Sequence, residues 1–191
     1  MNHPHPGSSH AAAPAGASAR PDPVAARITL LALDVDGVLT DGSIHVDHEG
    51  REFKRYNVRD GFALRLWEKM GFHAAVITGR TSHSILHRMA DLRVPHVIQG
   101  SKDKTASLGE LCAAARVTPE QIAFLGDDWP DLGVLRRVGY PMAVADASAP
   151  VKALARFMTE SRGGHGAVRD AVEHLLTAKG VMSAALALYD Q

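Results

Sequence analysis

The sequence predicts an α/β fold: a doubly wound, Rossmann-like parallel sheet with helices on both faces. Five short, continuous apolar runs recur along the chain, at residues 28–33, 74–78, 96–100, 122–126 and 141–145. Continuous apolar runs of this length are typical of strands that are buried on both faces of a parallel sheet. Segments with helical spacing of their apolar residues lie between the runs, and this alternation favours a parallel sheet.

The remaining elements can be placed around these runs. A small β-hairpin is expected from strands at residues 43–47 and 52–56, because Gly50 lies in the turn-forming sequence between them. Helices are expected from an N-cap at Asp60 to Met70, then up to Leu92, over 103–116, after Pro130, after Ser148 and over 166–179. The Ala- and Leu-rich end, residues 181–188, should pack on the body or on a neighbouring subunit.

The length and composition suit one domain. The chain has 191 residues, with 21 basic Lys and Arg side chains and 21 acidic ones. Residues 1–26 are rich in Ala, Pro, Gly, Ser and His, which predicts a disordered N-terminal tail. Residues 27–191 are then expected to form a single domain, since domains commonly contain about 100–200 residues.

The charge balance and the lone cysteine bear on partners and location. A formal net charge of zero gives no reason to expect nucleic acid or an anionic membrane as a partner. No apolar run approaches the roughly 20 residues that a membrane-spanning helix needs. Cys112 is the only cysteine and cannot form an internal disulfide, which favours a reducing compartment such as the cytoplasm.

Two aspartates directly follow the first apolar run, in the sequence Asp34-Val35-Asp36-Gly37. A turn or a helix cap would explain such a pair, because Asp and Gly are common turn residues. The alternative is chemical: Asp34 is ionised at neutral pH and can attack phosphorus without a separate base. Asp36 can protonate the leaving alcohol and later deprotonate the attacking water. Gly37 allows the backbone to approach a phosphate closely.

Two further polar sites follow later strands. Thr78 and Gly79 can hold a phosphoryl oxygen with a hydroxyl and backbone N–H groups, although a strand-end turn explains them equally well. Lys104 can offset charge on a transferring phosphoryl group, whereas most lysines at helix starts are simply solvated. Lys102 is expected to be an ordinary surface residue.

The strongest motif is the acidic sequence GDDWPD at residues 126–131. An acidic loop with a helix cap is the simpler explanation, but three acids within five residues would repel one another without a cation. Carboxylate and water ligands suit Mg²⁺. Ligands of such sheets bind at the carboxyl ends of the strands. Four reactive side chains are therefore expected to converge at one edge: Asp34, Thr78, Lys104 and Asp127.

The order of these motifs along the chain resembles that of the haloacid dehalogenase-type phosphatases. The resemblance implies that Asp34 is the nucleophile and a Mg²⁺ ligand. It implies that Asp36 is the acid/base and binds Mg²⁺ through its main-chain carbonyl, and that Asp127 is the third protein ligand. Thr78 and Lys104 would hold the phosphoryl group.

A more detailed likeness covers residues 28–179. The segment between Asp36 and Thr78 has room for a hairpin and one helix but not for a cap domain. The segments DVDGVLTDGSIHVDHEGREFKRYNVRDG, ITGR, QGSKDK and GGHGAVRD resemble the 3-deoxy-D-manno-octulosonate 8-phosphate phosphatases. This resemblance implies a small-molecule sugar phosphate as the partner and a role in lipopolysaccharide biosynthesis. It also implies a homotetramer in which the hairpin makes subunit contacts and helps to close the pocket.

Such a substrate carries a carboxylate as well as a phosphate, and arginines can bind carboxylates through two parallel hydrogen bonds. Besides Asp36, Thr78, Gly79 and Lys104, the resemblance implies substrate contacts at seven positions: Asn57, Arg59, Asp60, Gly61, Arg65, Arg80 and Arg88. Surface positions on helices would explain Arg65 and Arg88 equally well, and Asp60 could simply cap its helix.

Two residues depart from the family pattern. His165 stands where many members have Arg, and it could contact substrate in a neighbouring subunit or lie in a surface loop. Trp129 stands where a smaller apolar residue is common, and it could line the pocket or shield the metal. Asp128 and Asp131 are expected to support the metal ligands or to cap a helix.

Other functions remain open from the sequence alone. A phosphatase for another sugar acid phosphate, such as a sialic-acid-type 9-phosphate, would share this scaffold. A receiver-like signalling domain also uses Asp, Thr and Lys with Mg²⁺, but it has no acidic motif after the lysine. A catalytically inactive scaffold is disfavoured because all the expected reactive residues are present.

Overall fold

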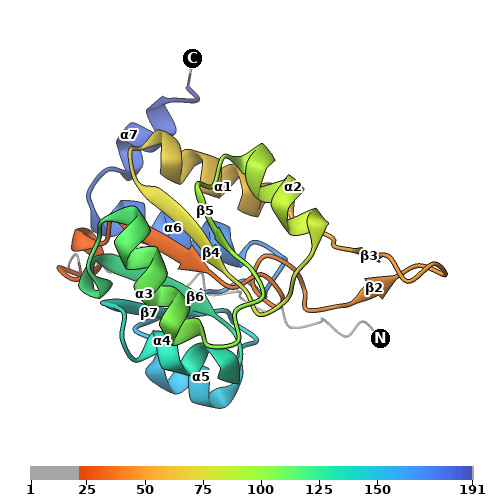
Figure 1. The fold of residues 1–191 in the computed structure, drawn as a ribbon. Helices are drawn as coiled ribbons and strands as arrows, with labels where there is room; N and C mark the ends of the chain where they lie inside the picture. The colour runs from red at the N-terminus through yellow and green to blue at the C-terminus, as the bar shows by residue number, and fades with distance from the viewer. Residues whose placement is uncertain (1–21, 191) are drawn as a thin grey trace, which may run out of the picture.

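A computed structural model describes residues 22–190 of the chain, and its centre is one six-stranded sheet (Figure 1). The strands are β1 (Leu30–Leu33), β4 (His73–Ile77), β5 (His96–Ile98), β6 (Ile122–Gly126), β7 (Tyr140–Ala143) and β8 (Phe157–Met158). They pair in parallel in the order β5-β4-β1-β6-β7-β8. The sheet therefore grows outwards from β1 first in one direction and then in the other, which is the doubly wound order. The predicted fold class is confirmed.

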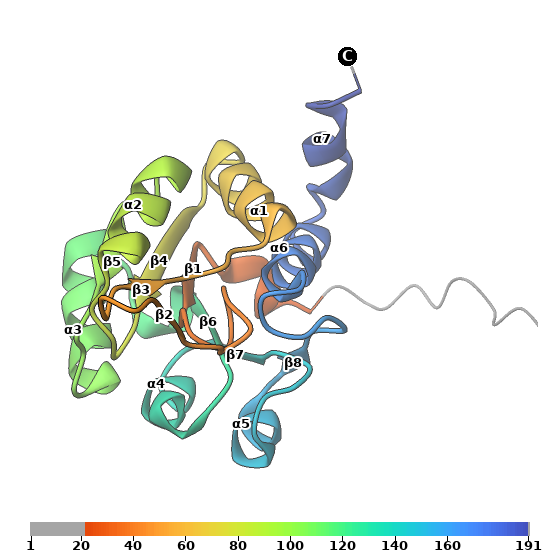
Figure 2. The ribbon, with the colours of Figure 1, turned by 90° about the vertical axis from the view of Figure 1, so that its right-hand side faces the viewer.

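The helices form a layer on each face of the sheet. They are α1 (Val58–Lys69), α2 (His83–Leu92), α3 (Lys104–Ala115), α4 (Leu132–Leu135), α5 (Ala149–Leu154), α6 (Ala167–Ala178) and α7 (Met182–Ala187). Helices α1, α2 and α6 lie together over one face, and α3, α4 and α5 lie over the other (Figure 2). The four residues of β1 are fully buried between these layers, as their continuous apolar sequence predicts.

The predicted hairpin is present but its paired strands are shorter than expected. Strands β2 (His45–Val46) and β3 (Glu52–Phe53) pair antiparallel and project from the body of the protein (Figure 1). The Asp47 carboxylate accepts N–H groups from Glu49 and Arg51, both at 2.9 Å, which holds the turn. Three apolar side chains of the hairpin are about half exposed: Ile44, Val46 and Phe53.

One helix boundary and one strand differ from the sequence-based predictions. Asn57, not Asp60, is the N-cap of α1, because the Asn57 side chain accepts the Arg59 N–H at 2.8 Å and the helix already begins at Val58. Strand β8 was not predicted, since a two-residue strand carries almost no periodic signal.

The N-terminal prediction falls mostly outside the described residues, which begin at Asp22. Within the expected tail, the short 3₁₀ helix η1 (Ala25–Arg27) packs against α6, and Ala25 is fully buried. The folded domain therefore includes residues that the sequence assigned to the tail. None of the helices found between residues 22 and 190 combines the length and the apolar character that crossing a membrane requires.

Candidate active site

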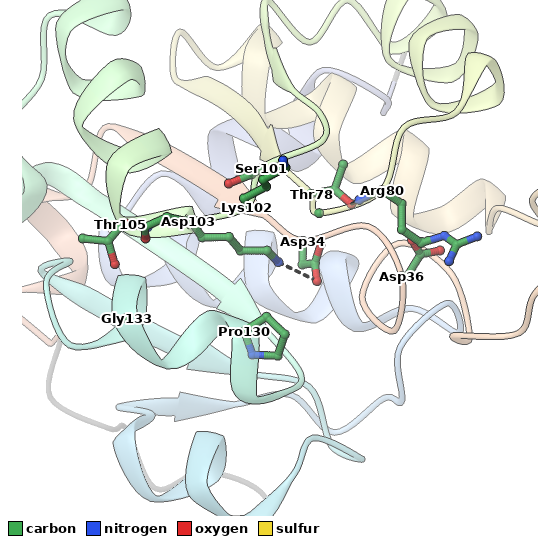
Figure 3. A pocket seen from close by; sticks show the side chains of 12 residues that line it. Asp34, Asp36, Thr78, Arg80, Ser101, Lys102, Asp103, Thr105, Pro130 and Gly133 are labelled. Atoms are coloured by element: carbon green, nitrogen blue, oxygen red, sulfur yellow. Dashed lines mark hydrogen bonds and ion pairs between the residues drawn. The ribbon is translucent and has the colours of Figure 1, made fainter.

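Four of the predicted residues converge at the carboxyl edge of the sheet. Asp34 follows β1 and Asp127 follows β6, and these strands are neighbours at the point where the strand order reverses. Thr78 follows β4, and Lys104 begins α3, with Asp103 as the N-cap of that helix. A cavity of about 370 Å³ opens here, and Figure 3 shows Asp34, Asp36 and Thr78 among the side chains that line it.

Lys104 joins two carboxylates from different segments, Asp34 directly after β1 and Asp131 in the 3₁₀ helix η3 (Trp129–Asp131). Its ammonium lies 2.8 Å from Oδ2 of Asp34 and 2.6 Å from Oδ1 of Asp131, and its side chain is 4% exposed. Burial alone lowers the pKa of Lys104, but the negative charges of Asp34 and Asp131 outweigh it and raise the pKa above its ordinary value. Lys104 is therefore a fully charged ammonium beside Asp34.

Asp34 itself is enclosed. Burial raises the pKa of its carboxyl to about 6, although the nearby Lys104 ammonium acts in the opposite direction. The backbone N–H of Val35 donates to Oδ1 of Asp34 at 2.7 Å, so one oxygen is held by the backbone and the other by Lys104. The carboxylate is thus fixed in orientation at the floor of the cavity.

Asp127 completes an acidic cluster that suits a divalent cation. Carboxylate oxygens of Asp34, Asp127 and Asp131 lie within 4.8 Å of one another. Burial, followed by the charges of Asp34 and Asp131, raises the pKa of Asp127 to about 8. Oδ1 of Asp127 is buried and has no hydrogen-bond partner among the described residues. With all three carboxyls ionised, they and the single ammonium of Lys104 carry a formal charge of −2, which a divalent cation would balance.

The approach of Gly37 to Asp127 leaves no room for a side chain. Gly37 has a φ of +88°, and a Cβ built there would collide with the Asp127 carboxylate. Gly163 is equally constrained, because its Cβ would collide with the carbonyl oxygen of Gly37. The loop that contains His165 therefore packs directly against the Asp34–Gly37 loop.

Thr78 and Ser101 form the opposite wall of the cavity. Thr78 is 1% exposed, and its carbonyl accepts the Ser101 N–H at 3.1 Å, which ties the loop after β5 to the end of β4. Gly79 and Arg80 also line the cavity. Lys102 is exposed, as expected, but it lies at the same rim.

Asp36 contacts the base of the hairpin, which sequence reasoning did not predict. Its Oδ1 pairs with the ammonium of Lys54 at 2.5 Å, and Lys54 also lies 2.8 Å from Oε1 of Glu52. Arg80 pairs with Glu52 and places its Nε 3.8 Å from Oδ2 of Asp36. Burial lowers the pKa of Lys54, but its hydrogen bonds to Asp36 and Glu52 outweigh burial and raise that pKa.

Six of the other predicted substrate residues do not line this cavity. Asn57 lines a separate hollow with Tyr56 and His165, while Arg65 lines another beside Tyr189. Arg88 lies over the ring of Tyr56. The six residues are Asn57, Arg59, Asp60, Gly61, Arg65 and Arg88. Their contact with substrate stays a prediction.

Asp60 has an evident structural role. It is 1% exposed, and its carboxylate accepts the N–H groups of Gly166 at 3.1 Å and Arg169 at 3.0 Å. It therefore caps α6 rather than its own helix. Asn57 reinforces this junction, since its Nδ2 donates to the carbonyl of Gly164 at 3.3 Å.

The structure also places two residues near the acidic motif, Trp129 and Asp131, for which the sequence left more than one role open. Trp129 is 66% exposed and does not line the cavity, so it is not part of the pocket wall within one chain. Asp131 contacts Lys104 directly, and its other oxygen accepts the Asp127 N–H at 3.0 Å, so it belongs to the centre of the site. Its spacing from Asp127 within GDDWPD was the available signal.

Comparison with known proteins assigns the chain to a family. A haloacid dehalogenase-like hydrolase profile matches residues 94–171. The 3-deoxy-D-manno-octulosonate 8-phosphate phosphatase of Yersinia pestis is 40% identical over 164 residues, which cover 86% of this chain and 88% of that protein.

Solved structures agree with this assignment. The 3-deoxy-D-manno-octulosonate 8-phosphate phosphatase of Moraxella catarrhalis, in complex with a magnesium ion, a phosphate ion and a KDO molecule, has a TM-score of 0.85 and 36% identity. That match covers 87% of this chain and 96% of that one. The cobalt-bound enzyme of Haemophilus influenzae has a TM-score of 0.82 and 35% identity, covering 88% and 96%. The chain therefore belongs to the 3-deoxy-D-manno-octulosonate 8-phosphate phosphatase family of haloacid dehalogenase-like hydrolases, and it is a phosphoric monoester hydrolase.

Proposed function

We propose that this protein hydrolyses 3-deoxy-D-manno-octulosonate 8-phosphate to the free sugar acid and phosphate, with Mg²⁺ as cofactor. The single observation that supports the chemistry best is the position of Lys104 between Asp34 and Asp131, beside Asp127. The likeness to the Yersinia pestis enzyme over most of both chains supports the choice of substrate.

The proposed metal ligands are the carboxylates of Asp34 and Asp127 and the main-chain carbonyl of Asp36. The acidic cluster with its formal charge of −2 and the unpartnered oxygen of Asp127 support this assignment. When bound, Mg²⁺ would neutralise charge on the phosphoryl oxygens and orient the phosphate beside Asp34. Asp131 would hold Lys104 and the backbone of Asp127 in place.

In the first step, a carboxylate oxygen of Asp34 attacks phosphorus. A bond forms between this oxygen and phosphorus, while the bond between phosphorus and the sugar oxygen breaks. Asp36 donates its proton to the departing sugar oxygen, so the sugar acid leaves as an alcohol. Lys104 and Thr78 stabilise the charge on the phosphoryl oxygens during the transfer.

In the second step, water attacks the phosphorus of the Asp34 acyl phosphate. Asp36, now a carboxylate, takes a proton from this water as the new bond to phosphorus forms. The bond between phosphorus and Asp34 then breaks, which releases inorganic phosphate and regenerates both aspartates.

The substrate carboxylate is assigned to arginines at the edge of the phosphate cavity and beyond it. Arg80 already lines the cavity, while Arg59, Arg65 and Arg88 lie farther along α1 and α2. Together with Asn57 they would act where a neighbouring subunit meets this edge of the protein, while the buried Asp60 and Gly61 would support them from within. We assign the exposed hairpin to subunit contacts in a homotetramer, because an isolated two-stranded hairpin is marginal in water.

The sugar acid product would enter lipopolysaccharide biosynthesis, and the enzyme would act in the cytoplasm. The function is tested by phosphate release over a panel of sugar phosphates with Mg²⁺ and with a chelator. The panel includes 3-deoxy-D-manno-octulosonate 8-phosphate and a sialic-acid-type 9-phosphate. We expect the first to have the highest kcat/KM and the chelator to abolish activity. A preference for the 9-phosphate, or activity in metal-free buffer, would contradict the proposal.

A further inference from the structure

Lys54 is the residue through which the hairpin reaches the reacting groups. It lies just after β3, yet its side chain is only 1% exposed, and its ammonium meets Asp36 from the loop after β1. Burying a charged ammonium away from water costs free energy unless the charge is paired with an opposite one. Its partners are the carboxylates of Asp36 and Glu52.

The four charges at this junction balance. Asp36 and Glu52 supply two negative charges, and Lys54 and Arg80 supply two positive ones. The Asp34, Asp127 and Asp131 cluster, by contrast, has more negative than positive charge. The side chains of the balanced group therefore need no cation, and we look for the role of Lys54 in its contact with Asp36.

The contacts of Lys54 distinguish the two oxygens of Asp36. An ammonium can only donate hydrogen bonds, so Oδ1 of Asp36 must accept from Lys54. Oδ2 is buried and has no hydrogen-bond partner among the described residues. Arg80 Nε, at 3.8 Å from Oδ2, is beyond hydrogen-bonding distance. Oδ2 is therefore the oxygen on which Asp36 can carry and transfer a proton.

We propose that Lys54 is a positioning residue for this reaction: it holds Oδ1 of Asp36 so that Oδ2 carries the proton to the leaving sugar oxygen and later takes one from water. Glu52 holds Lys54 in place and is itself held by Arg80, since Glu52 forms ion pairs with both of them. The inference rests on the proposed function, in which Asp36 is the acid and base. It also links the hairpin to the chemical step.

The dependence on leaving group tests the proposal. A sugar alkoxide leaves poorly without a proton, whereas p-nitrophenolate leaves readily without one. We expect Lys54→Met to lower kcat/KM for the sugar phosphate by about 10²-fold, the scale of a positioned general acid. For p-nitrophenyl phosphate kcat/KM should fall much less, because this constant reports only the steps up to loss of the leaving group. Lys54→Arg, which keeps the charge and the donors, should recover part of the activity.

A double-variant cycle separates this inference from the proposed function. Asp36→Asn alone should give the same selective loss, and adding Lys54→Met should lower kcat/KM little further, because both changes remove one shared function. If Asp36→Asn keeps wild-type activity, the proposed function fails. Suppose that Asp36→Asn lowers kcat/KM mainly for the sugar phosphate, as expected. If Lys54→Met then slows both substrates equally, slows neither or raises kcat, the role of Lys54 is overturned and the proposed function stands. Lys54→Gln, which preserves a donor without charge, replaces Lys54→Met if that variant does not fold.

Discussion

Carboxylate oxygens of Asp34 and Asp127 lie within 4.8 Å of each other, although the two residues are far apart in the sequence. Their closeness follows from the sheet, because β1 and β6 pair in parallel with Leu33 opposite Leu125. Asp34 directly follows Leu33, and Asp127 comes shortly after Leu125. The Asp34 N–H continues the pairing by donating to the carbonyl of Leu125 at 3.1 Å. Backbone hydrogen bonds thus hold like charges together where a cation can join them.

Removing Asp127 should abolish stabilisation by Mg²⁺ while the fold survives. A ligand at 100 times its Kd stabilises a protein by about 2.7 kcal/mol, and the wild-type protein should gain a comparable amount from saturating Mg²⁺. Asp127→Ala should gain little. Thermal unfolding with Mg²⁺ and with a chelator measures this stabilisation for the wild-type protein and for the variant. Glu110→Ala, at an exposed position on α3, is the matched control. An unchanged response of Asp127→Ala to Mg²⁺ would refute the metal assignment.

Two glycines with similar backbone angles should differ in their effect on the metal. Gly37 and Gly50 have φ of +88° and +78°, so alanine is strained at both by roughly 1–2 kcal/mol. Only at Gly37 would the new Cβ meet the Asp127 carboxylate, since nothing lies within 4 Å of it at Gly50. Gly37→Ala should therefore weaken Mg²⁺ binding, measured by calorimetry, and Gly50→Ala should not. Equal Mg²⁺ affinities would show that the close approach has no consequence for the metal.

The hairpin should determine the oligomeric state. Val46 is 56% exposed on β2, and an aspartate there would place a charge in the proposed subunit contact. We expect Val46→Asp to dissociate the tetramer and to lower activity, as measured by light scattering together with phosphate release. Met158→Asp, at a similarly exposed site on β8, should leave the tetramer intact. A fully active wild-type monomer would refute the proposed assembly.

His174 should make the protein less stable in mild acid. Its ring stacks on Phe157 with centroids 3.8 Å apart, and its Nε2 lies 2.9 Å from the hydroxyl of Tyr140. Burial lowers the pKa of His174, while the charge of Asp22 acts weakly against this. Below a pH of about 6.5 the unfolded chain takes up a proton that the folded chain resists, so the free energy of unfolding should fall as the pH falls.

Denaturant unfolding at several pH values between neutral and mildly acidic conditions measures this effect. His174→Phe keeps the stacking but cannot take up a proton, so its stability should depend less on pH than that of the wild-type protein. Parallel pH dependences of the two proteins would contradict the prediction.

The sequence predicted those parts of the site that follow from local pattern. Asp34, Thr78 and Asp127 each come at the end of a buried strand, and parallel strands bring such positions to one edge. Lys54 could not be predicted, because its contact with Asp36 joins the segment after β3 to the loop after β1, and no local pattern specifies that pairing. The capping of α6 by Asp60 is similarly non-local, since it joins positions from opposite halves of the chain.

The covalent step at Asp34 is the central claim, and trapping the intermediate tests it most directly. The wild-type enzyme is quenched in acid during turnover of 3-deoxy-D-manno-octulosonate 8-phosphate with Mg²⁺, and its peptides are analysed by mass spectrometry. The account predicts that the peptide containing Asp34 gains the mass of one phosphoryl group, and that treating the quenched enzyme with borohydride converts Asp34 to homoserine. A phosphoryl group on another residue, or none on Asp34 of the wild-type enzyme during active turnover, would contradict it.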